Sequence, residues 1–427
     1  MRQGKRAGVR GSRLDVGIIA GMTFRLMIVA GEPSGDAHAA SLIKSISRVG
    51  TNSKIEWFGA VGPKMRAAGV ESIVNTDELA IMGMIEVGRV LPRFWKVFQL
   101  LRQTAVERRP DAVVLVDWPE FNMKLARVLH KRGIRVIYYI SPQLWAWRSY
   151  RLRGIRRDVD LLLSILPFEP EWYETRGVKH VKFIGNPLAG EVFPRYGRDV
   201  FCVKNELDAA KPIVALLPGS RHKELERILP PMIEAASRIA AERSEVQFVI
   251  PLAPSRSVKE AEAIIEKKRG AGLRLPVVLR LTEHETREAL ASVDAAAVAS
   301  GTATLEAALI GVPMVIVYKE SPINWYVLGR MINTEHFGLI NLIAGERLVT
   351  ELMQNDFSSK TLANELLWLL DREHSADLQA RLGVAVARLG GPGASDRAAA
   401  AVLEAVEGWT MKDSAKVKRM DSNRKLP

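Results

Sequence analysis

Three turns in the sequence carry side chains that could do chemistry, and each follows a short apolar run. The first is "VAGEPSGD", Val29 to Asp36, which separates "RLMIVA" from the helical pattern "AHAASLIKSI". A glycine turn between a strand and a helix commonly holds phosphate on the backbone N–H groups that open the helix. This turn carries Glu32 and Asp36 instead, and two carboxylates repel a phosphate. The ligand of this loop is therefore not an anion, unless both acids only cap the helix.

The second turn is "PGSR", Pro218 to Arg221, which lies between "IVALL" and the helical pattern "HKELERI". It lacks acids and places a guanidinium beside the start of a helix. The helix dipole, free N–H groups around Gly219 and Ser220 and the planar donor of Arg221 suit a diphosphate. A capped turn with an arginine at the surface is the simpler alternative.

The third turn opens "SGTATLEAALIGVPMVIVYK". Ser300 can cap a helix that begins near Thr302, and Gly301 lets a ligand approach the backbone. Glu306 lies about one turn into this helix, where a carboxylate can accept hydrogen bonds from both hydroxyls of a ribose. An ordinary strand–helix–strand unit explains this stretch equally well by itself, but two such turns in one domain favour a nucleotide site.

One further carboxylate, Asp117, follows the apolar run of "VVLVDWPEFN". Doubly wound sheets place ligands and reactive groups at the carboxyl ends of their strands. A carboxylate there can remove a proton from a substrate, although a lone aspartate at a strand end is more often a helix cap.

These residues need elements to position them, and ten apolar runs of strand length recur along the chain. Near-continuous apolar strands that alternate with helices are typical of parallel sheets covered on both faces. The fold class is therefore α/β, with two doubly wound, Rossmann-like domains that face a cleft. The predicted strands are Leu26–Ala30, Ile55–Gly59, Ala112–Val116, Val136–Ile140, Leu161–Ile165, Ile213–Leu217, Val246–Pro251, Val277–Leu281, Ala295–Ala299 and Met314–Tyr318; the main helical patterns are 120–132, 222–242, 257–268, 302–310 and 358–371.

A proline-rich, aromatic connection at Ile184–Gly197 separates two series of such elements, and we place the domain boundary there. We expect a first domain at 24–190, a second at 198–390 and a C-terminal helix at 395–408 that can pack back on the first. Residues 1–23 are expected to form a disordered basic extension, and residues 410–427 a basic tail.

The charge and composition exclude several classes of protein. Of the net charge of +13, residues 1–23 supply +4 (five Arg/Lys, one Asp) and residues 410–427 another +4 (six Arg/Lys, two Asp). The remaining basic cluster, "RSYRLRGIRR" at 148–157, has no nucleic-acid-binding signature beside it, so no nucleic acid is expected. The single Cys202 cannot form an intrachain disulfide, which fits a reducing cytoplasm. No uncharged apolar run reaches 18 residues, so no spanning helix is expected.

The motifs together resemble a known family. "PGSR" followed by "SGTATLEAALIGVPMVIVYK" is similar to the nucleotide-sugar half of GT-B glycosyltransferases. The blocks "AGEPSGD", "FGAVGPKMRAAGVES", "ELAIMGMIEVG", "DWPEFN", "YYISPQLWAWR", "LPFEPEWY" and "IGNPL" resemble the lipid-A-disaccharide synthases. This similarity extends from about Arg25 to about Glu407. The family usually has histidine where Asn186 stands, so this chain lacks that imidazole.

The resemblance implies an inverting hexosyltransferase that moves a diacylated glucosamine from UDP onto diacylated glucosamine 1-phosphate, forms a β-1,6 link and releases UDP. It implies that the first domain holds the acceptor sugar, whose hydroxyls suit the acidic loop. Asp117 would be the base and Glu32 an acceptor of sugar hydrogen bonds, while Asp36 would cap the helix that follows it. The residues expected to bind UDP are Gly219, Ser220, Arg221, Ser300, Gly301, Thr302, Glu306 and Asn341.

The segment "IMGMIEVGRVLPRFWKVFQLLR", 81–102, predicts a basic, aromatic helix suited to a membrane surface. Because the implied substrates are acylated, we expect the protein to lie peripherally on the anionic inner face of the cytoplasmic membrane. A helix packed on its own sheet is the alternative. The residues expected to face the acceptor or the membrane are Ser34, Met84, Phe94, Trp95, Phe98, Arg148 and Arg151.

Two other functions stay open. Another GT-B-type enzyme, such as a sugar-nucleotide epimerase, would share the second domain, and a non-catalytic nucleotide-sugar sensor would need no base. No cofactor or metal is expected. "DVD", Asp158–Asp160, has the spacing of a metal-binding carboxylate pair but follows the arginine cluster, so we expect salt bridges there. His38 and His222 are expected to be surface residues.

Overall fold

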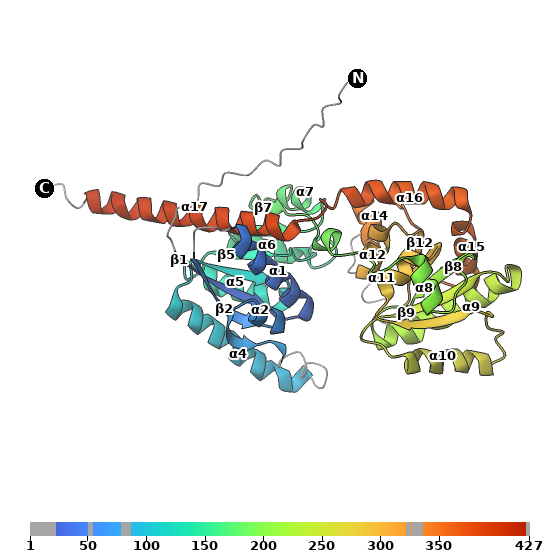
Figure 1. The fold of residues 1–427 in the computed structure, drawn as a ribbon. Helices are drawn as coiled ribbons and strands as arrows, with labels where there is room; N and C mark the ends of the chain where they lie inside the picture. Colours follow the sequence, from blue (N-terminus) through green and yellow to red (C-terminus); the bar gives the residue numbers. More distant parts are fainter. Residues whose placement is uncertain (1–22, 50–53, 78–86, 322–324, 326–335, 424–427) are drawn as a thin grey trace, which may run out of the picture. The chain divides into compact units, whose positions relative to one another are not determined.

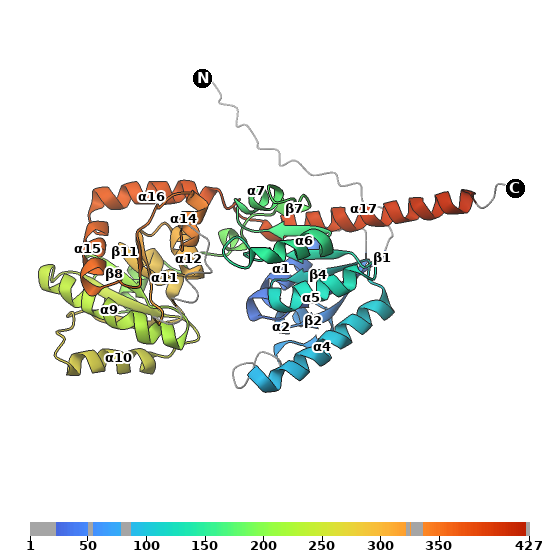
Figure 2. The same cartoon turned by 180° about the vertical axis from the view of Figure 1, so that it is seen from behind.

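The computed structural model describes residues 23–49, 54–77, 87–321, 325 and 336–423. The chain forms two compact units, and helices flank the sheet in each of them (Figures 1 and 2). The first unit comprises Met1–Ser141, Gly154–Leu163 and Ser395–Pro427, and the second comprises Pro142–Arg153 and Ser164–Ala394. The predicted α/β class with two doubly wound parallel sheets is confirmed.

The first sheet has the strand order β3-β2-β1-β4-β5-β6-β7. The chain therefore moves one way across the sheet after β1 and the opposite way after β4, which puts the two series of connecting helices on opposite faces. The strands are β1 (Thr23–Ala30), β2 (Lys54–Val61), β3 (Glu71–Asn75), β4 (Ala112–Val116), β5 (Val136–Tyr139), β6 (Leu161–Ser164) and β7 (Val181–Phe183). The α-helices along this part of the chain are α1 (Pro33–Val49), α2 (Pro63–Ala67), α4 (Val87–Arg108), α5 (Pro119–His130), α6 (Leu152–Asp158) and α7 (Glu169–Glu174), followed by the 3₁₀ turn η2 (Pro187–Gly190). By the bounds given above, β7, α7 and η2 fall in the second unit.

The second sheet repeats this pattern with the order β10-β9-β8-β11-β12-β13. Helices α9 and α15 pack side by side on one face, and α8, α11 and α12 pack together on the other. The strands are β8 (Ile213–Leu217), β9 (Gln247–Leu252), β10 (Leu279–Glu283), β11 (Ala295–Ala299), β12 (Met314–Tyr318) and β13 (Glu351–Met353). The helices are α8 (Arg198–Lys204), α9 (His222–Glu242), α10 (Val258–Gly270), α11 (Thr286–Ser292), α12 (Thr302–Ile310), α14 (Leu339–Ala344), α15 (Ser359–Leu369) and α16 (Arg372–Ala387).

All ten predicted strands are present, although the one predicted at Val277–Leu281 begins at Leu279 and is only partly buried. Every residue of β4, β8 and β11 is buried. The three strands that the sequence did not indicate, β3, β7 and β13, are short and stand at the ends of the strand orders. A strand at a sheet edge buries less apolar surface, so its pattern is weaker.

The last helix, α17 (Ala394–Asn423), belongs to the first unit. Asp396 forms an ion pair with Arg48 at the end of α1, and the guanidinium of Arg135 lies 5.5 Å from the ring centre of Trp409. The salt bridges predicted for "DVD" are also found, because Asp158 pairs with Arg157 and Asp160 with Arg135.

The prediction that Asp36 caps its own helix is wrong. Helix α1 begins at Pro33, so Asp36 already lies inside its first turn. Its carboxylate is 2% exposed and accepts hydrogen bonds from the backbone N–H groups of Gly62, Lys64 and Met65 at 2.9–3.1 Å. These N–H groups open α2, so Asp36 caps the neighbouring helix and ties the turn after β1 to the turn after β2.

Candidate active site

The two acids of the first unit lie at the carboxyl ends of neighbouring strands. Glu32 follows β1, and Asp117 follows β4, which pairs with β1 in the centre of the sheet. The connection after β1 crosses to one side of the sheet and the connection after β4 crosses to the other. An open α/β sheet binds ligands where the direction of the connections reverses in this way. The fold thus brings together two carboxylates that are 85 positions apart, 117 minus 32, in the sequence.

The backbone at Asp117 is strained and firmly held. Asp117 and Trp118 have φ of 48° and 49°, in the left-handed region that side chains other than glycine rarely adopt. The carbonyl oxygen of Asp117 accepts hydrogen bonds from the Tyr138 hydroxyl and from Asn122 Nδ2, both at 2.8 Å. Its N–H donates to the Tyr139 carbonyl at 3.1 Å. The surrounding structure therefore stabilises an unfavourable backbone conformation, which fixes the orientation of the Asp117 side chain.

Both carboxylates bind protons more readily than ordinary acids do. Burial raises the pKa of Asp117, while the Trp118 N–H and the charge of His38 oppose this shift. Burial and the negative charge of Asp117 raise the pKa of Glu32. No hydrogen bond from the described residues to the Glu32 carboxylate is found. His38 thus bears on the site, although its place in the first turns of α1 gave no signal of this.

An indole covers the turn between β1 and α1. A Cβ atom at Gly31 would lie 2.1 Å from the Trp118 ring, so only glycine fits beneath it. Trp118 stacks on Phe121 with ring centres 4.1 Å apart, and Phe94 of α4 lies 5.8 Å from Trp118. Ser34 is exposed in the first turn of α1, beside Glu32. The acidic turn is therefore bounded by aromatic rings.

In the second unit, the PGSR turn follows β8 as predicted, but its N–H groups are not free. Glu224 Oε2 accepts from the N–H groups of Ser220 and Arg221 at 2.9 and 3.1 Å. A Cβ at Gly219, whose φ is 110°, would approach Glu224 Oε2 to 2.4 Å. The prediction of free N–H groups is therefore wrong, because a carboxylate one turn into α9 occupies them. The Arg221 side chain is 84% exposed and extends from this turn.

The free helix start lies instead at α12, after β11. Gly301 is its N-cap residue and offers no side chain, and no side-chain cap is found, so Ser300 does not cap this helix as predicted. Among the described residues, the N–H groups of Thr302 and Ala303 have no hydrogen-bond acceptor. Uncapped N–H groups at a helix start attract anions. Because β8 and β11 are neighbours at the reversal of the second sheet, this turn lies beside the PGSR turn.

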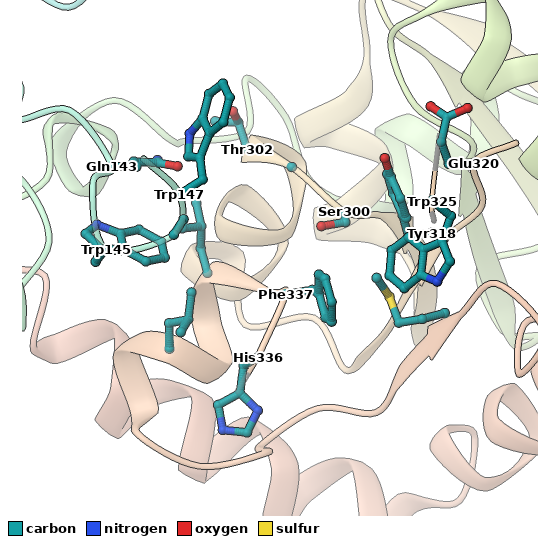
Figure 3. A pocket seen from close by; sticks show the side chains of 15 residues that line it. Gln143, Trp145, Trp147, Ser300, Thr302, Tyr318, Glu320, Trp325, His336 and Phe337 are labelled. Atoms are coloured by element: carbon teal, nitrogen blue, oxygen red, sulfur yellow. The ribbon is translucent and has the colours of Figure 1, made fainter. Parts of the chain in front are cut away.

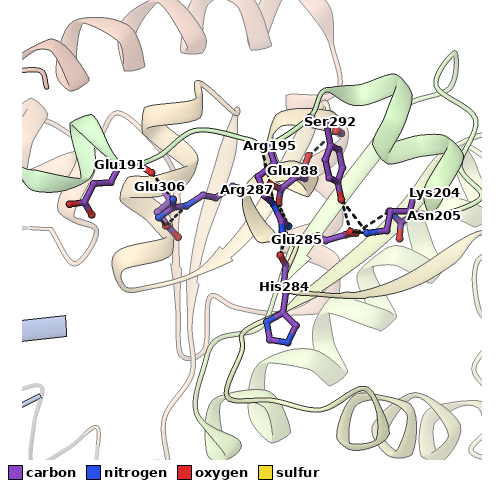
Figure 4. Close-up of polar contacts among 11 residues, drawn as sticks. Glu191, Arg195, Lys204, Asn205, His284, Glu285, Arg287, Glu288, Ser292 and Glu306 are labelled. Carbon is purple, nitrogen blue, oxygen red and sulfur yellow. Dashed lines mark hydrogen bonds and ion pairs between the residues drawn. The ribbon is translucent and has the colours of Figure 1, made fainter. Parts of the chain in front are cut away.

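Glu306 is fixed by an arginine on the neighbouring helix. Arg287 of α11 donates from Nε and Nη2 to the same oxygen, Glu306 Oε1, at 3.1 and 2.9 Å (Figure 4). Its Nη1 donates to the Glu191 carbonyl at 2.6 Å. No hydrogen bond from the described residues to the second oxygen, Glu306 Oε2, is found, so this oxygen can still accept one from a ligand.

A cavity of about 340 Å³ joins these groups. Its lining combines the exposed guanidinium, the uncapped start of α12, the Glu306 carboxylate and an apolar wall after β9. Seven of the eight residues expected to bind UDP line it: Gly219, Ser220, Arg221, Ser300, Gly301, Thr302 and Glu306. The cavity is large enough for part of a small ligand, and its polar groups suit hydroxyls and an anion.

The other predicted residues lie elsewhere. Asn341 is fully buried, and its amide bonds Val349 and Glu351, so its side chain orders the stretch before β13. The Arg148 guanidinium lies 4.2 Å from the Trp147 ring centre, and Arg151 lies 5.9 Å from that of Tyr150, both in the second unit. Met84 lies outside the described residues.

The helix predicted to lie on a membrane is partly packed. Val97 and Leu101 of α4 are buried, and Phe98 lies against Phe121 of α5 with ring centres 5.6 Å apart. Trp95, in contrast, is 62% exposed. Part of the apolar face therefore belongs to the core of the first unit, as the alternative interpretation has it, while Trp95, Leu100 and Val106 of this helix are exposed to solvent. No described helix is long and apolar enough to cross a membrane.

Comparison with known proteins identifies a family with matching sequence. Residues 26–405 match the model of the family described as lipid-A-disaccharide synthetase. The chain is 41% identical over 383 residues to a lipid-A-disaccharide synthase of Geobacter sulfurreducens, covering 90% of this chain and 97% of that protein. It is 42% identical over 364 residues to the same-named protein of Nitrosococcus oceani, covering 85% and 92%.

Solved structures share the fold at low identity. A putative UDP-N-acetylglucosamine 2-epimerase of Listeria monocytogenes has a TM-score of 0.61 at 15% identity and covers 90% of this chain and 97% of its own. Anabaena HepE, solved with UDP-glucose, has a TM-score of 0.52 at 14% identity, covering 90% and 100%. MurG of Acinetobacter baumannii has a TM-score of 0.51 at 14% identity, covering 91% and 99%. These likenesses establish the fold.

The coupling of the two acids can be measured by titration. Asp117→Asn should lower the pKa of Glu32, because it removes the negative charge that helps to raise it, while the part caused by burial should persist. In the parent, therefore, Glu32 should keep its proton to a higher pH than in the variant. The measurement is carboxyl ¹³C NMR on protein labelled at glutamate, with Glu32→Gln to assign the signal. Glu56→Gln, at the amino end of β2, is the matched control and should leave this pKa unchanged. An unaltered Glu32 titration in Asp117→Asn would contradict the coupling.

Proposed function

The chain belongs to the lipid-A-disaccharide synthetase family. We propose that it joins the sugar of a UDP-sugar donor to an acceptor sugar, with Asp117 as the base and UDP bound in the second unit. The chain is a glycosyltransferase of lipid A disaccharide formation. In the proposal, the donor is UDP-2,3-diacylglucosamine and the acceptor is 2,3-diacylglucosamine 1-phosphate, linked β-1,6. The observation that carries it is Asp117 itself: a strained, half-buried carboxylate with a raised pKa at the centre of the first sheet.

The first unit activates the acceptor. A sugar hydroxyl is a weak nucleophile, and a carboxylate that takes its proton during attack raises its reactivity. The raised pKa makes Asp117 a stronger base than an ordinary aspartate. Glu32 accepts hydrogen bonds from other hydroxyls of the acceptor, because its carboxylate lies next to the base with no hydrogen-bond partner among the described residues. An acidic turn therefore suits a neutral sugar ring.

The second unit holds the donor and receives the leaving group. As the acceptor oxygen bonds to the anomeric carbon from the opposite face, the bond from that carbon to the phosphate oxygen breaks, and UDP leaves with the electron pair. One such displacement inverts the anomeric centre. The start of α12 and the guanidinium of Arg221 stabilise the charge that develops on the diphosphate. Glu306, held by Arg287, accepts hydrogen bonds from the ribose hydroxyls.

Neither alternative function has an observation in its favour. Two structural relatives named as epimerases are 15% and 10% identical to this chain, which supports a shared fold only. A sensor without catalysis gives no reason for the strained backbone at Asp117. The family match spans both units, so it supports the transferase over either alternative.

The proposal includes a peripheral position on the inner face of the cytoplasmic membrane. Its support is the exposed Trp95 on a helix that also presents Arg93 and Lys96 to solvent. Indole rings favour the interface between acyl chains and water, and basic side chains favour anionic head groups. Both substrates carry acyl chains, so an enzyme that reaches them at the membrane avoids moving whole lipids through water.

The role of Asp117 is tested by Asp117→Asn. Turnover should fall at least about a hundredfold, the low end for loss of a general base, while UDP affinity and melting temperature stay near those of the parent. The matched control is Glu120→Gln, an exposed acid in the first turn of α5, which should keep its turnover. Disaccharide formation is measured with both acylated substrates. A folded Asp117→Asn protein with near-parental turnover would move the base elsewhere.

The UDP site is tested without lipid by calorimetry. Arg221→Ala and Glu306→Ala should each weaken UDP binding about 10- to 100-fold, since a hydrogen bond to a charged group contributes roughly 1.5–3 kcal/mol. Arg243→Ala, at the far end of the same helix α9, should bind UDP as the parent does. Glu306→Ala should also lose its preference for UDP over 2′-deoxy-UDP. If both variants bind UDP with parental affinity, the donor site is misplaced.

Membrane association is tested by co-sedimentation with anionic vesicles. The parent should bind, and high salt should release only part of it, because salt screens the basic side chains and not the indole. Trp95→Ser should lose most of the salt-resistant fraction and keep its UDP affinity. Val277→Ser, which alters a residue of the second unit that is 91% exposed, is the control. Equal sedimentation of the parent and Trp95→Ser at high salt would exclude this role for Trp95.

A further inference from the structure

A second cavity of the second unit, about 520 Å³ in volume, has a largely apolar lining (Figure 3). In the view of Figure 3, Trp145 and Trp147 lie on one side, Tyr318 and Trp325 on the other, and Ser300 and Phe337 between them. Leu339, Leu342 and Met353 complete its aliphatic wall. A cavity of this size and character binds apolar groups.

The aromatic side chains of the lining are held in place by contacts behind the cavity and by contacts with one another. Trp145 Nε1 donates to the buried Glu169 carboxylate at 3.1 Å, so the ring presents only its carbon surface. Trp325 lies between Tyr318 and Phe337, with ring centres at 6.2 and 5.6 Å. The one acid of the lining, Glu320, is already paired with Arg227 of α9. The charge of Glu320 is therefore neutralised within the protein, and an uncharged ligand suits the cavity.

The two cavities of this unit meet at one turn. Ser300, Gly301 and Thr302 line both of them. Of these two cavities, Arg221 and Glu306 line the smaller one and not the larger, whereas Trp145, Trp147 and Trp325 line the larger one and not the smaller. A ligand with its ribose at Glu306 and its diphosphate at the start of α12 would therefore have the group beyond the diphosphate directed into the larger cavity.

Because the two cavities meet at residues 300–302, we infer that the larger cavity receives an acyl chain of the donor. The inference rests on the proposed function, which puts UDP in the smaller cavity and an acylated glucosamine beyond the diphosphate. Acyl groups on the sugar leave the ring close to the anomeric carbon, next to the turn at 300–302. Each methylene that leaves water for an apolar wall strengthens binding about fourfold. The cavity thus contributes to donor affinity and selects for an acylated sugar.

The first test uses the parent protein and UDP-glucosamine acylated with short, medium or long chains, in solution without vesicles. Affinity relative to UDP should rise by a few-fold per methylene and then level off when the cavity is full. A donor with a photoreactive diazirine at the end of its chain should label the segments 143–147 and 336–342. Affinity that is independent of chain length, or labelling confined to α4 and α5 of the first unit, would overturn the inference.

The second test changes the walls. Trp147→Ser with Phe337→Ser should lower affinity for the medium-chain donor at least tenfold and leave UDP affinity within about twofold. Trp368→Ser is the matched control, since Trp368 is an exposed tryptophan of the same unit that lies outside both cavities. Equal losses for donor and UDP would contradict the inference. Should the double variant not fold, the photolabelling of the parent decides.

The two proposals fail in different ways. A parent protein that neither binds UDP nor forms the disaccharide would overturn the proposed function itself. A parent that does both, but whose photolabel lies outside the larger cavity, would retain that function and lose only the acyl-chain site.

Discussion

The reversal of strand order in the middle of each sheet is the constraint on which both candidate sites depend. Beside β1 and β4, and again beside β8 and β11, the chain leaves two adjacent strands toward opposite faces. No connection covers the carboxyl ends at that point, so side chains of the two following turns share an open edge. Glu32 meets Asp117 in this way, and Arg221 meets the start of α12. Neither pair is near in sequence, and neither would meet in a sheet wound in one direction.

The same local geometry serves two kinds of ligand because its charges differ. In the first unit the turns carry acids whose pKa values are raised, which suits hydroxyls and proton transfer. In the second unit an arginine and an uncapped helix start suit an anion. Glu224 reduces the number of donors available to an anion, because its carboxylate accepts hydrogen bonds from the N–H groups of the PGSR turn that a phosphate could otherwise use. A diphosphate must therefore rely on Arg221 and α12, or displace an internal anion.

The sequence was sufficient to predict the parallel sheets and the strand-end turns that carry the candidate residues, because buried strands and glycine turns leave local patterns. It was insufficient wherever a side chain bonds across the fold. Asp36 looked like the cap of its own helix, yet its partners lie 26 to 29 residues away. Tertiary packing brings Arg287 to Glu306 and places Trp145 and Phe337 in the lining of one cavity. The periodicity of the sequence does not predict such contacts. The edge strands β3 and β7 were missed since little of their surface is buried, and β13 was missed since it has only three residues.

In our proposals both substrates are acylated, which sets a physical problem that the two units address differently. A chain of ten methylenes costs about 8 kcal/mol to move from lipid into water, which is more than a few polar contacts can offset. The protein must therefore give each chain an apolar surface or leave it in the membrane. In our proposals the second unit gives the chain an apolar surface, a cavity bounded by Trp145, Trp325 and Phe337 next to the turn at 300–302. The first unit leaves its acyl chain in the membrane, since Trp118 and Phe121 pack on one another and Trp95 of α4 is exposed. On this view, donor selectivity resides in a cavity and acceptor capture in an interface, and the two can change independently in evolution.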